Sequence, residues 1–171
     1  LKASNPSASD LFGEHVDIYG NTVVVGARNE DTSGSNSGAV YVFVESGGEW
    51  SQQALLKASN SGSSDLFGFG VSLWGDTLAI GSPGDDSATN VINGSQGDST
   101  SSGDYGSVFI FERSNDAWAQ QAYIKAPNPG VDDFFGISVS LNNDLLLVGA
   151  YLEDSNATGV GGNLFNNSGG N

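Results

Sequence analysis

Four aspartates within one polar segment are the residues of this chain whose chemistry best suits a ligand. The segment separates two apolar runs, and its aspartates are Asp85, Asp86, Asp98 and Asp104. Calcium takes six or more hard oxygen ligands, so four converging carboxylates predict a calcium site. Because the regular Asp-x-Asp-x-Asp alternation of a calcium loop is absent, a solvated acidic loop is the alternative interpretation.

Residues for catalysis are scarce. The chain has one histidine, His15, and no cysteine. A lone imidazole cannot build a zinc site, and no serine stands in the nucleophile-elbow pattern. We therefore predict that the protein is not an enzyme and that calcium is its one candidate cofactor.

Three asparagines satisfy the Asn-x-Ser/Thr pattern of N-glycosylation, namely Asn93, Asn156 and Asn166. All three fall in polar, variable loops that follow an apolar run, where an exposed acceptor is expected. The pattern predicts glycosylated surface loops if the source organism glycosylates its proteins.

Net charge excludes two classes of partner. Twenty acidic residues against five basic ones give a formal net charge of -15. Such a surface repels nucleic acid phosphates and anionic membrane surfaces. Apolar runs such as 145–148 are too short to cross a bilayer. We expect no nucleic acid partner and no membrane insertion.

An internal repeat supplies the elements that must position these residues. Each unit has a lysine, a Phe-Gly pair whose phenylalanine comes ten residues later, and a further glycine thirteen residues after the first. The lysines are Lys2, Lys57 and Lys125, the phenylalanines are Phe12, Phe67 and Phe135, and the later glycines are Gly26, Gly81 and Gly149. Length varies only between that glycine and the next one, at Gly38 or Gly106. Strict spacing with insertions confined to one loop is typical of a repeat architecture.

Each segment of the unit has the pattern of a β-strand. Apolar residues alternate at 16–18, 71–73 and 139–141, and nearly continuous apolar runs follow at 22–25, 77–80 and 145–148. Between them stand Gly-Asn, Gly-Asp or Asn-Asp pairs, which suit two-residue hairpin turns. Third strands are expected at 40–43 and 108–111, and fourth strands at 52–56 and 120–124. Four antiparallel strands per unit predict the blade of a β-propeller.

An aspartate precedes each Phe-Gly pair, at Asp10, Asp65 and Asp133. One interpretation is structural, with the aspartate capping a turn or pairing with the lysine of its unit. The other places its charge at a rim that faces a ligand or a metal ion. Recurrence in all three units favours the structural interpretation.

The motifs Asp-Leu-Phe-Gly at 10–13 and 65–68 and Gly-Ala-Val-Tyr-Val-Phe at 38–43 resemble the FG-GAP repeat, the blade motif of the integrin α-subunit head. The resemblance extends over essentially the whole chain and implies an all-β propeller. It also implies a non-enzymatic adhesion or recognition module, extracellular or at the cell surface. Integrin-like blades hold calcium in an Asp-rich first hairpin, and these short hairpins lack that cage.

The repeat boundaries predict a partial propeller of two full blades plus parts of two more. We expect the end of a preceding blade at 1–9, one repeat at 10–64, a second with a long insertion at 65–132, and an incomplete third at 133–171. Open edges are expected to meet further blades of a longer chain or other copies. The variable loops are expected to bind a protein or glycan ligand. The alternatives are an extracellular fibre or sheath assembled edge to edge, and a non-catalytic appendage of an enzyme.

Overall fold

A computed structural model describes residues 1–97 and 103–155 of the chain. Ten strands and no helix are found in this part of the chain. The strands are β1 (Val16–Tyr19), β2 (Thr22–Ala27), β3 (Ala39–Ser46), β4 (Glu49–Leu56), β5 (Gly70–Trp74), β6 (Thr77–Ser82), β7 (Ser107–Ser114), β8 (Ala117–Ile124), β9 (Phe135–Asn142) and β10 (Leu145–Ala150). The prediction of an all-β fold is confirmed.

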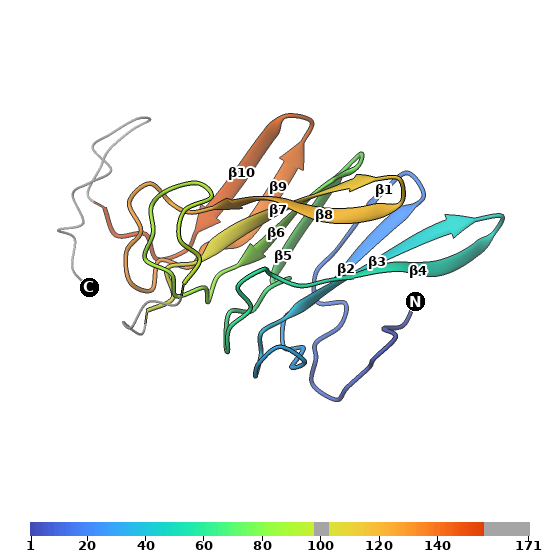
Figure 1. The fold of residues 1–171 in the computed structure, drawn as a ribbon, viewed down its shortest axis with the longest axis horizontal. Coiled ribbons are helices and arrows are strands. Elements are labelled where there is room, and N and C mark those ends of the chain that lie inside the picture. The colour runs from blue at the N-terminus through green and yellow to red at the C-terminus, as the bar shows by residue number, and fades with distance from the viewer. Residues whose placement is uncertain (98–102, 156–171) are drawn as a thin grey trace.

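The strands form three antiparallel sheets that follow one another along the chain. Their orders are β1-β2-β3-β4, β5-β6-β7-β8 and β10-β9. The sheets are arranged side by side as a fan (Figure 1), and β9 contacts both β5 and β6 of the sheet before it. Consecutive meanders stacked in this way are blades of a β-propeller, as the repeat predicts. We call them blades 1, 2 and 3.

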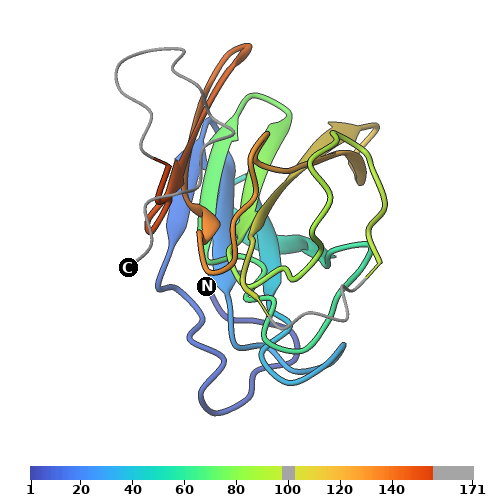
Figure 2. The same ribbon diagram turned by 90° about the vertical axis from the view of Figure 1, so that its left-hand side faces the viewer.

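Blade 3 differs from the other two because the described residues give it only its inner strands. Figure 2 shows the β9–β10 hairpin at the side of the molecule, next to the strands of blade 2. Leu145 and Leu147 of β10 are 75% and 74% exposed, whereas the matching strands β2 and β6 are largely buried. Although its apolar run matches those of β2 and β6, β10 therefore lacks their burial.

Two-residue hairpins join the first strand to the second in every blade, and the third to the fourth in blades 1 and 2, as the sequence predicts. Gly20, Gly75 and Asn143 begin the inner hairpins with φ values of 58°, 60° and 52°. Asn115 and Asp116, between β7 and β8, both have positive φ. Glycine, asparagine and aspartate tolerate this left-handed region better than other residues do, which explains their recurrence at the turns.

Glycines also set the distance between blades. The backbone of Gly136 crosses so close to Gly81 that a Cβ on Gly81 would lie 1.8 Å from the Gly136 carbonyl oxygen. Gly26 meets the Gly68 carbonyl in the same way. The strict spacing between these glycines therefore reflects a backbone crossing that leaves no room for any side chain.

The largest apolar core lies between blades 1 and 2. Phe67 is fully buried there, with its ring centroid 5.4 Å from that of Phe109 and 6.1 Å from that of Phe111. Val24 and Val42 of blade 1 pack into the same cluster. The Phe-Gly phenylalanine of one unit thus fills the space between its own blade and the preceding one.

Every blade has two distinct ends. The tight turns lie at one end, which we call the hairpin end, and the β2–β3 and β6–β7 connections lie at the other, which we call the loop end (Figure 1). The β6–β7 connection is the longer of the two. All variation in loop length therefore falls on the loop end.

Candidate functional site

A lysine and an acidic residue form an ion pair at the loop end of blades 1 and 2. In blade 2, Lys125 Nζ lies 2.9 Å from Asp85 Oδ1, and the two side chains are 0% and 1% exposed. In blade 1, Lys57 pairs with Glu30, and these side chains are 20% and 1% exposed. Each lysine follows the fourth strand, and each acid stands four residues after the glycine of the second strand. We call each such lysine–acid pair, together with its hydrogen-bond partners, a clamp.

Hydrogen bonds surround both carboxylate oxygens in the clamp of blade 2. Asp85 Oδ1 accepts from the Tyr123 hydroxyl at 2.8 Å and from the Ser87 backbone N–H at 3.1 Å, besides Lys125. Asp85 Oδ2 accepts from Asn60 Nδ2 at 2.9 Å. The buried carboxylate thus accepts four hydrogen bonds, one of them from an ammonium group, and charge-assisted bonds of this kind fix its position strongly.

The clamp of blade 1 has the same plan with different contributors. Glu30 Oε1 accepts from Asn5 Nδ2 at 2.9 Å and from Thr32 Oγ1 at 2.7 Å. Lys57 Nζ also donates to the Gly38 carbonyl at 2.9 Å. Asn5 and Asn60 each stand three residues after a repeat lysine, so the asparagine of one unit reaches the acid of the next blade.

Burial and pairing act in opposite directions on these charges. Burial lowers the pKa of Lys125, and the Asp85 carboxylate opposes that shift without cancelling it. Burial alone would raise the pKa of Glu30, but hydrogen bonds from Lys57 and Thr32 outweigh it and leave that pKa below 4.5. Each ion pair joins the end of the last strand of its blade to the loop after the second strand.

The structure gives Asp85 partners within the protein that the sequence prediction did not include. Its oxygens face Lys125, Tyr123 and Asn60, so they are occupied within the protein. Lys125 also lies 5.9 Å from the ring centroid of Tyr105. The sequence prediction missed the clamp, although an acid at a fixed distance after each second-strand glycine was a signal for it.

Asp86 and Asp104, two more of the four aspartates predicted to bind calcium, lie near each other. Burial raises the pKa of Asp104, and the charges of Asp132 and Asp86 raise it further. Asp98 lies outside the described residues. Within the described ranges, no three carboxylate or imidazole groups are arranged to hold a metal ion. The calcium site stays a prediction.

Aspartates before the Phe-Gly pairs cap turns. Asp65 Oδ2 accepts from the Gly62 backbone N–H at 2.6 Å, and Asp133 Oδ2 accepts from that of Gly130 at 2.6 Å. Asp10 does the same for Ser7 at 2.9 Å. The geometry agrees with turn capping, one of the two structural roles considered, while Lys57 and Lys125 form their ion pairs elsewhere.

The long β6–β7 loop is fastened to the outer strand of its own blade. Asn93 Oδ1 accepts from the Tyr123 backbone N–H at 2.8 Å, and the Asn93 N–H donates to the Tyr123 carbonyl at 2.8 Å. Its neighbours Val91 and Ile92 are 57% and 62% exposed. Asn93 itself is exposed, as a glycosylated residue must be, but modification there stays a prediction. The other two candidates, Asn156 and Asn166, lie outside the described residues.

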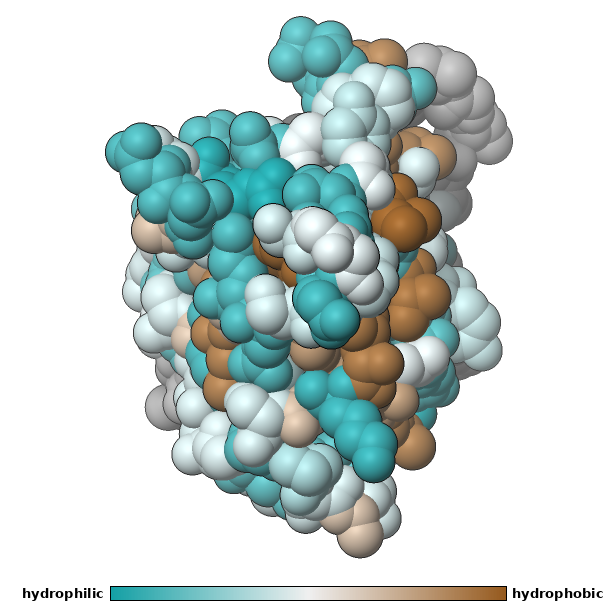
Figure 3. All heavy atoms as spheres, turned by 90° about the vertical axis from the view of Figure 1, so that its right-hand side faces the viewer, coloured by the Kyte–Doolittle hydropathy of each residue, from teal (hydrophilic) through white to brown (hydrophobic). Residues whose placement is uncertain are grey.

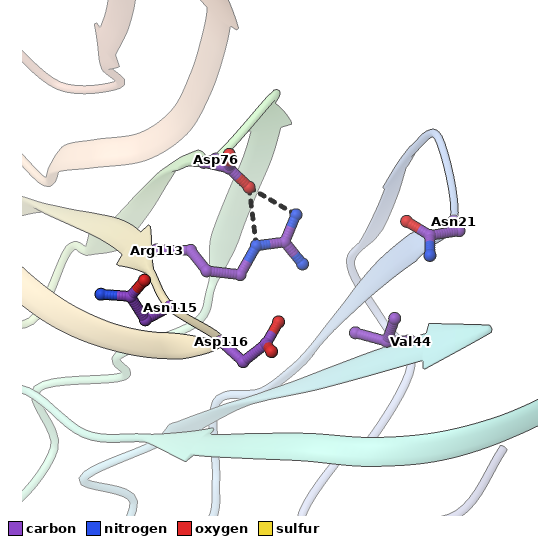
Figure 4. Close-up of a pocket in the computed structure, with 6 residues that line it drawn as sticks. All are labelled: Asn21, Val44, Asp76, Arg113, Asn115 and Asp116. Atoms are coloured by element: carbon purple, nitrogen blue, oxygen red, sulfur yellow. Dashed lines mark hydrogen bonds and ion pairs between the residues drawn. The ribbon is translucent and has the colours of Figure 1, made fainter. Parts of the chain in front are cut away.

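At the hairpin end, a hollow of about 310 Å³ lies where blades 1 and 2 meet (Figure 4). Arg113 Nε donates to Asp76 Oδ1 at 2.7 Å within blade 2, and Arg113 Nη1 donates to Thr22 Oγ1 of blade 1 at 2.9 Å. Trp118 Nε1 donates to Gln53 Oε1 at 2.8 Å across the same junction. The Arg113–Thr22 and Trp118–Gln53 bonds therefore join the two blades at this end.

His15 belongs to a cluster that the repeat does not reproduce. Its ring centroid lies 5.2 Å from that of Phe69, and the Arg28 guanidinium lies 5.0 Å from the same ring. Arg28 also pairs with Glu14 at 2.5 Å. The arrangement packs His15 against an aromatic ring, and nothing in it resembles a nucleophile with a base.

Within the described residues, no helix is long and apolar enough to cross a membrane. The comparison with protein families identifies FG-GAP repeats at residues 1–43, 50–111 and 118–163. No curated protein sequence proved similar to the chain. FG-GAP repeats occur in β-propeller, integrin-like extracellular domains, and the family is generally non-enzymatic. Repeat matches over most of the chain and a structure built of propeller blades lead to one conclusion, that this chain belongs to the FG-GAP repeat family.

Proposed function

We propose that the chain is part of an extracellular or cell-surface recognition module that binds a protein or glycan ligand at its loop end. The observation that carries the proposal is the pair Val91 and Ile92 of the β6–β7 loop, whose side chains are exposed next to a fastened residue, Asn93. We call this pair the loop tip. Asn93 bonds the loop to β8, and Asp85 bonds it to Lys125. A short segment held in place on a scaffold loses little conformational entropy when it binds, which favours affinity.

The tip itself has the chemistry of a contact surface. Val91 and Ile92 are neighbouring apolar side chains, both more than half exposed, on a chain of net charge -15. An apolar contact surrounded by polar and acidic residues is typical of the centre of a recognition site. The cationic or neutral surface of a partner would suit the acidic surroundings better than an anionic one.

A binding screen tests the proposal. The chain, fluorescently labelled, is applied to an array of extracellular-matrix proteins and glycans, and the Val91→Ser/Ile92→Ser variant is applied in parallel. We expect the chain to bind a small number of spots and the variant to bind the same spots at least tenfold more weakly, because its apolar contact is lost.

The matched control is Val16→Ser/Ile18→Ser on β1, a pair that is 60% and 61% exposed and lies away from the loop tip. This control removes a similar apolar area and should keep full binding. Equal loss of binding in both variants, or no binding to any spot, would contradict recognition through the loop tip.

Exposed apolar strands favour a second candidate, a repeat protein assembled edge to edge into an extracellular fibre. Figure 3 shows apolar patches among hydrophilic atoms on the side where β4 and the N-terminus lie. Leu145 and Leu147 expose apolar area at the other end of the fan. Sedimentation velocity at increasing concentration separates the candidates, because a fibre former gives a growing series of species and a recognition module does not.

The calcium prediction has a direct test in the melting temperature with 5 mM calcium, on the order of five times a weak extracellular Kd, and with excess chelator. Bound calcium stabilises the folded state, so the temperature should fall when the ion is removed. An unchanged melting temperature would contradict a structural calcium site.

A further inference from the structure

The hollow between blades 1 and 2 at the hairpin end has a lining that is polar except for one valine. Its residues are Asn21, Val44, Asp76, Arg113, Asn115 and Asp116. A volume of about 310 Å³ falls at the lower end of the ~300–1,000 Å³ range of small-molecule sites. Figure 4 shows the Arg113 guanidinium and the Asp116 carboxylate pointing into the space between the blades. The hollow therefore has the size of a ligand site and hydrogen-bonding groups directed into it.

Hydrogen bonds fix the central groups of the hollow. Arg113 Nη2 lies 2.5 Å from Asp76 Oδ1, the oxygen that also accepts from Arg113 Nε, so these contacts leave Asp76 Oδ2 as an acceptor. Arg113 Nη1 donates to Thr22, which is fully buried. Gln53 Nε2 lies 3.5 Å from Asp116 Oδ1, and a bond of this length leaves that carboxylate most of its accepting capacity. Donors and acceptors that are already positioned lose little entropy when a ligand binds.

Two exposed aromatic rings lie beside the hollow. The ring centroids of Tyr19 and Trp74 are 5.2 Å apart, and the two residues are 41% and 38% exposed. Tyr19 is paired with Thr22 across the first hairpin, and Thr22 is paired with Val44, which lines the hollow. Directly paired residues share a face of an antiparallel sheet, so Tyr19 lies on the face of blade 1 that borders the hollow. Trp74 extends the aromatic surface to blade 2.

Sugar units require both of these chemistries side by side. One face of a sugar ring presents weakly positive C–H groups, which stack on the negative face of an aromatic ring. The hydroxyl groups at its edge need donors and acceptors in a fixed arrangement, which planar carboxylate, amide and guanidinium groups provide. An aromatic surface next to a polar hollow therefore suits a chain of sugar units better than a wholly apolar or a wholly charged ligand.

Charge selects among saccharides. The lining contains the guanidinium of Arg113 and the carboxylates of Asp76 and Asp116. Because Arg113 is already paired with Asp76, the lining of the hollow offers no further positive charge to the sulfate or carboxylate of an acidic polysaccharide. The net charge of -15 repels such a ligand as well. A neutral saccharide meets neither obstacle.

We propose that the hollow and the Tyr19–Trp74 pair form a binding site for a neutral oligosaccharide. One sugar ring stacks on Tyr19, and the next places its hydroxyl groups between Arg113 and Asp116. This site lies at the hairpin end, whereas the loop tip belongs to the loop end. The two sites are therefore separate, and the oligosaccharide site does not depend on recognition at the loop tip.

The test is a titration of the full chain, isotopically labelled, with neutral hexaoses of glucose, mannose and N-acetylglucosamine. Nuclear magnetic resonance follows the indole N–H signal of each tryptophan separately. We expect at least one hexaose to shift the Trp74 signal saturably while the Trp50 signal stays in place. Trp50 is 42% exposed, but it is paired with Glu45, the neighbour of Val44 in β3, and so lies on the other face of blade 1.

Matched variants assign the contact. Tyr19→Ala removes a ring from the face that borders the hollow and should weaken hexaose binding at least about tenfold. Trp50→Ala removes an equally exposed ring from the other face and should bind as the unaltered chain does. Asp116→Asn keeps the turn, since asparagine tolerates the positive φ found there, and should weaken binding by a smaller factor. The loop-tip variant Val91→Ser/Ile92→Ser should keep full hexaose binding, which separates this site from recognition at the loop end.

Melting temperatures establish that each variant is folded. Absence of a Trp74 shift with every hexaose would overturn the proposal, and a shift produced instead by a lysine oligomer would assign the hollow to a cationic ligand. Equal loss of hexaose binding in folded Tyr19→Ala and Trp50→Ala would overturn it as well, because the two rings lie on opposite faces of blade 1.

Discussion

The clamps of blades 1 and 2 have the same plan but differ in their contact with solvent. Lys125 and Asp85 are almost completely buried, whereas Lys57 is 20% exposed beside its buried partner Glu30. The loop that contains Asp85 is also the longer one, and its Tyr105 lies close to Lys125. Tyr105 stands directly before Gly106, where blade 1 has Ser37 before Gly38. The comparison teaches that a larger residue at this one repeat position accompanies the deeper burial of the ion pair.

Burial changes what such an ion pair contributes. A solvated pair gains little from its attraction, while a buried pair is costly to break because one unpaired charge remains in a medium of low dielectric constant. We therefore expect the two clamps to respond unequally to the same kind of substitution, with blade 2 the more sensitive.

The largest effect is expected from Asp85→Ala. The substitution leaves the Lys125 ammonium buried without its carboxylate and deprives Tyr123 of an acceptor. Loss of one partner of a buried pair costs about 3–5 kcal/mol, and we expect that decrease in the free energy of unfolding by urea titration. A loss below about 1 kcal/mol would show that water reaches the pair.

A companion variant separates charge burial from loss of packing. Asp85→Leu combined with Lys125→Met replaces both charges by apolar groups, so it should recover much of the stability lost in Asp85→Ala. If the double variant is no more stable than Asp85→Ala, the neighbouring hydrogen bonds, and not the unpaired charge, are the dominant contribution.

A second prediction compares two glycines. Gly81 lies at the junction between blades 2 and 3, whereas Gly149 lies in β10, on which no further described blade packs. Gly81→Ala places a methyl group against the backbone carbonyl of Gly136, which cannot move without separating blades 2 and 3, and should cost about 3 kcal/mol. At Gly149, the nearest atom is the side-chain hydroxyl of Ser138, which can rotate away. Gly149→Ala should therefore cost less than about 1 kcal/mol. Equal losses in thermal unfolding would contradict the assignment of Gly81 to a backbone crossing.

The sequence predicted most of the fold because the repeat determines it locally. Alternating apolar residues, two-residue turns such as Gly75-Asp76 and the Phe-Gly pairs all depend on neighbours in the chain. Each predicted strand accordingly lies within one of β1 to β10, and the extra residues lie at one or both of its ends.

The site was harder to predict because its groups come from distant parts of the chain. Asp85 was grouped with Asp86, Asp98 and Asp104 by proximity in sequence, yet its partner Lys125 is forty residues away. Pairing across a loop of variable length leaves no fixed spacing between the two charges. Only the fixed distance of each acid from its second-strand glycine could have revealed it.

Glu30→Gln tests the more open clamp and should have a smaller effect than Asp85→Ala. Lys57 keeps its bond to the Gly38 carbonyl and part of its hydration, so loss of the carboxylate charge should cost about 1–2 kcal/mol. Urea titration of both variants under the same conditions gives the ratio directly. A loss equal to that of Asp85→Ala would show that the difference in burial between the clamps has no energetic consequence.

The smallest effect is the pH dependence of the same clamp. The Glu30 carboxyl has a folded-state pKa below its ordinary value of 4.5, so the folded state binds its proton less readily than the unfolded chain does. The stability that this difference contributes is fully present above pH 4.5 and is lost as the pH falls through the lower, folded-state pKa.

Acid unfolding of the unaltered chain should therefore be steeper than that of Glu30→Gln below pH 4.5. Asp104 and Asp133 have raised pKa values and act with the opposite sign, but they are common to both proteins, so their contributions cancel in the difference. Parallel curves of unfolding free energy against pH would mean that the Glu30 carboxylate gains nothing from Lys57 and Thr32. In that case the clamp of blade 1 would contribute to the position of the loop and not to stability, and the contrast with blade 2 would be larger than burial alone implies.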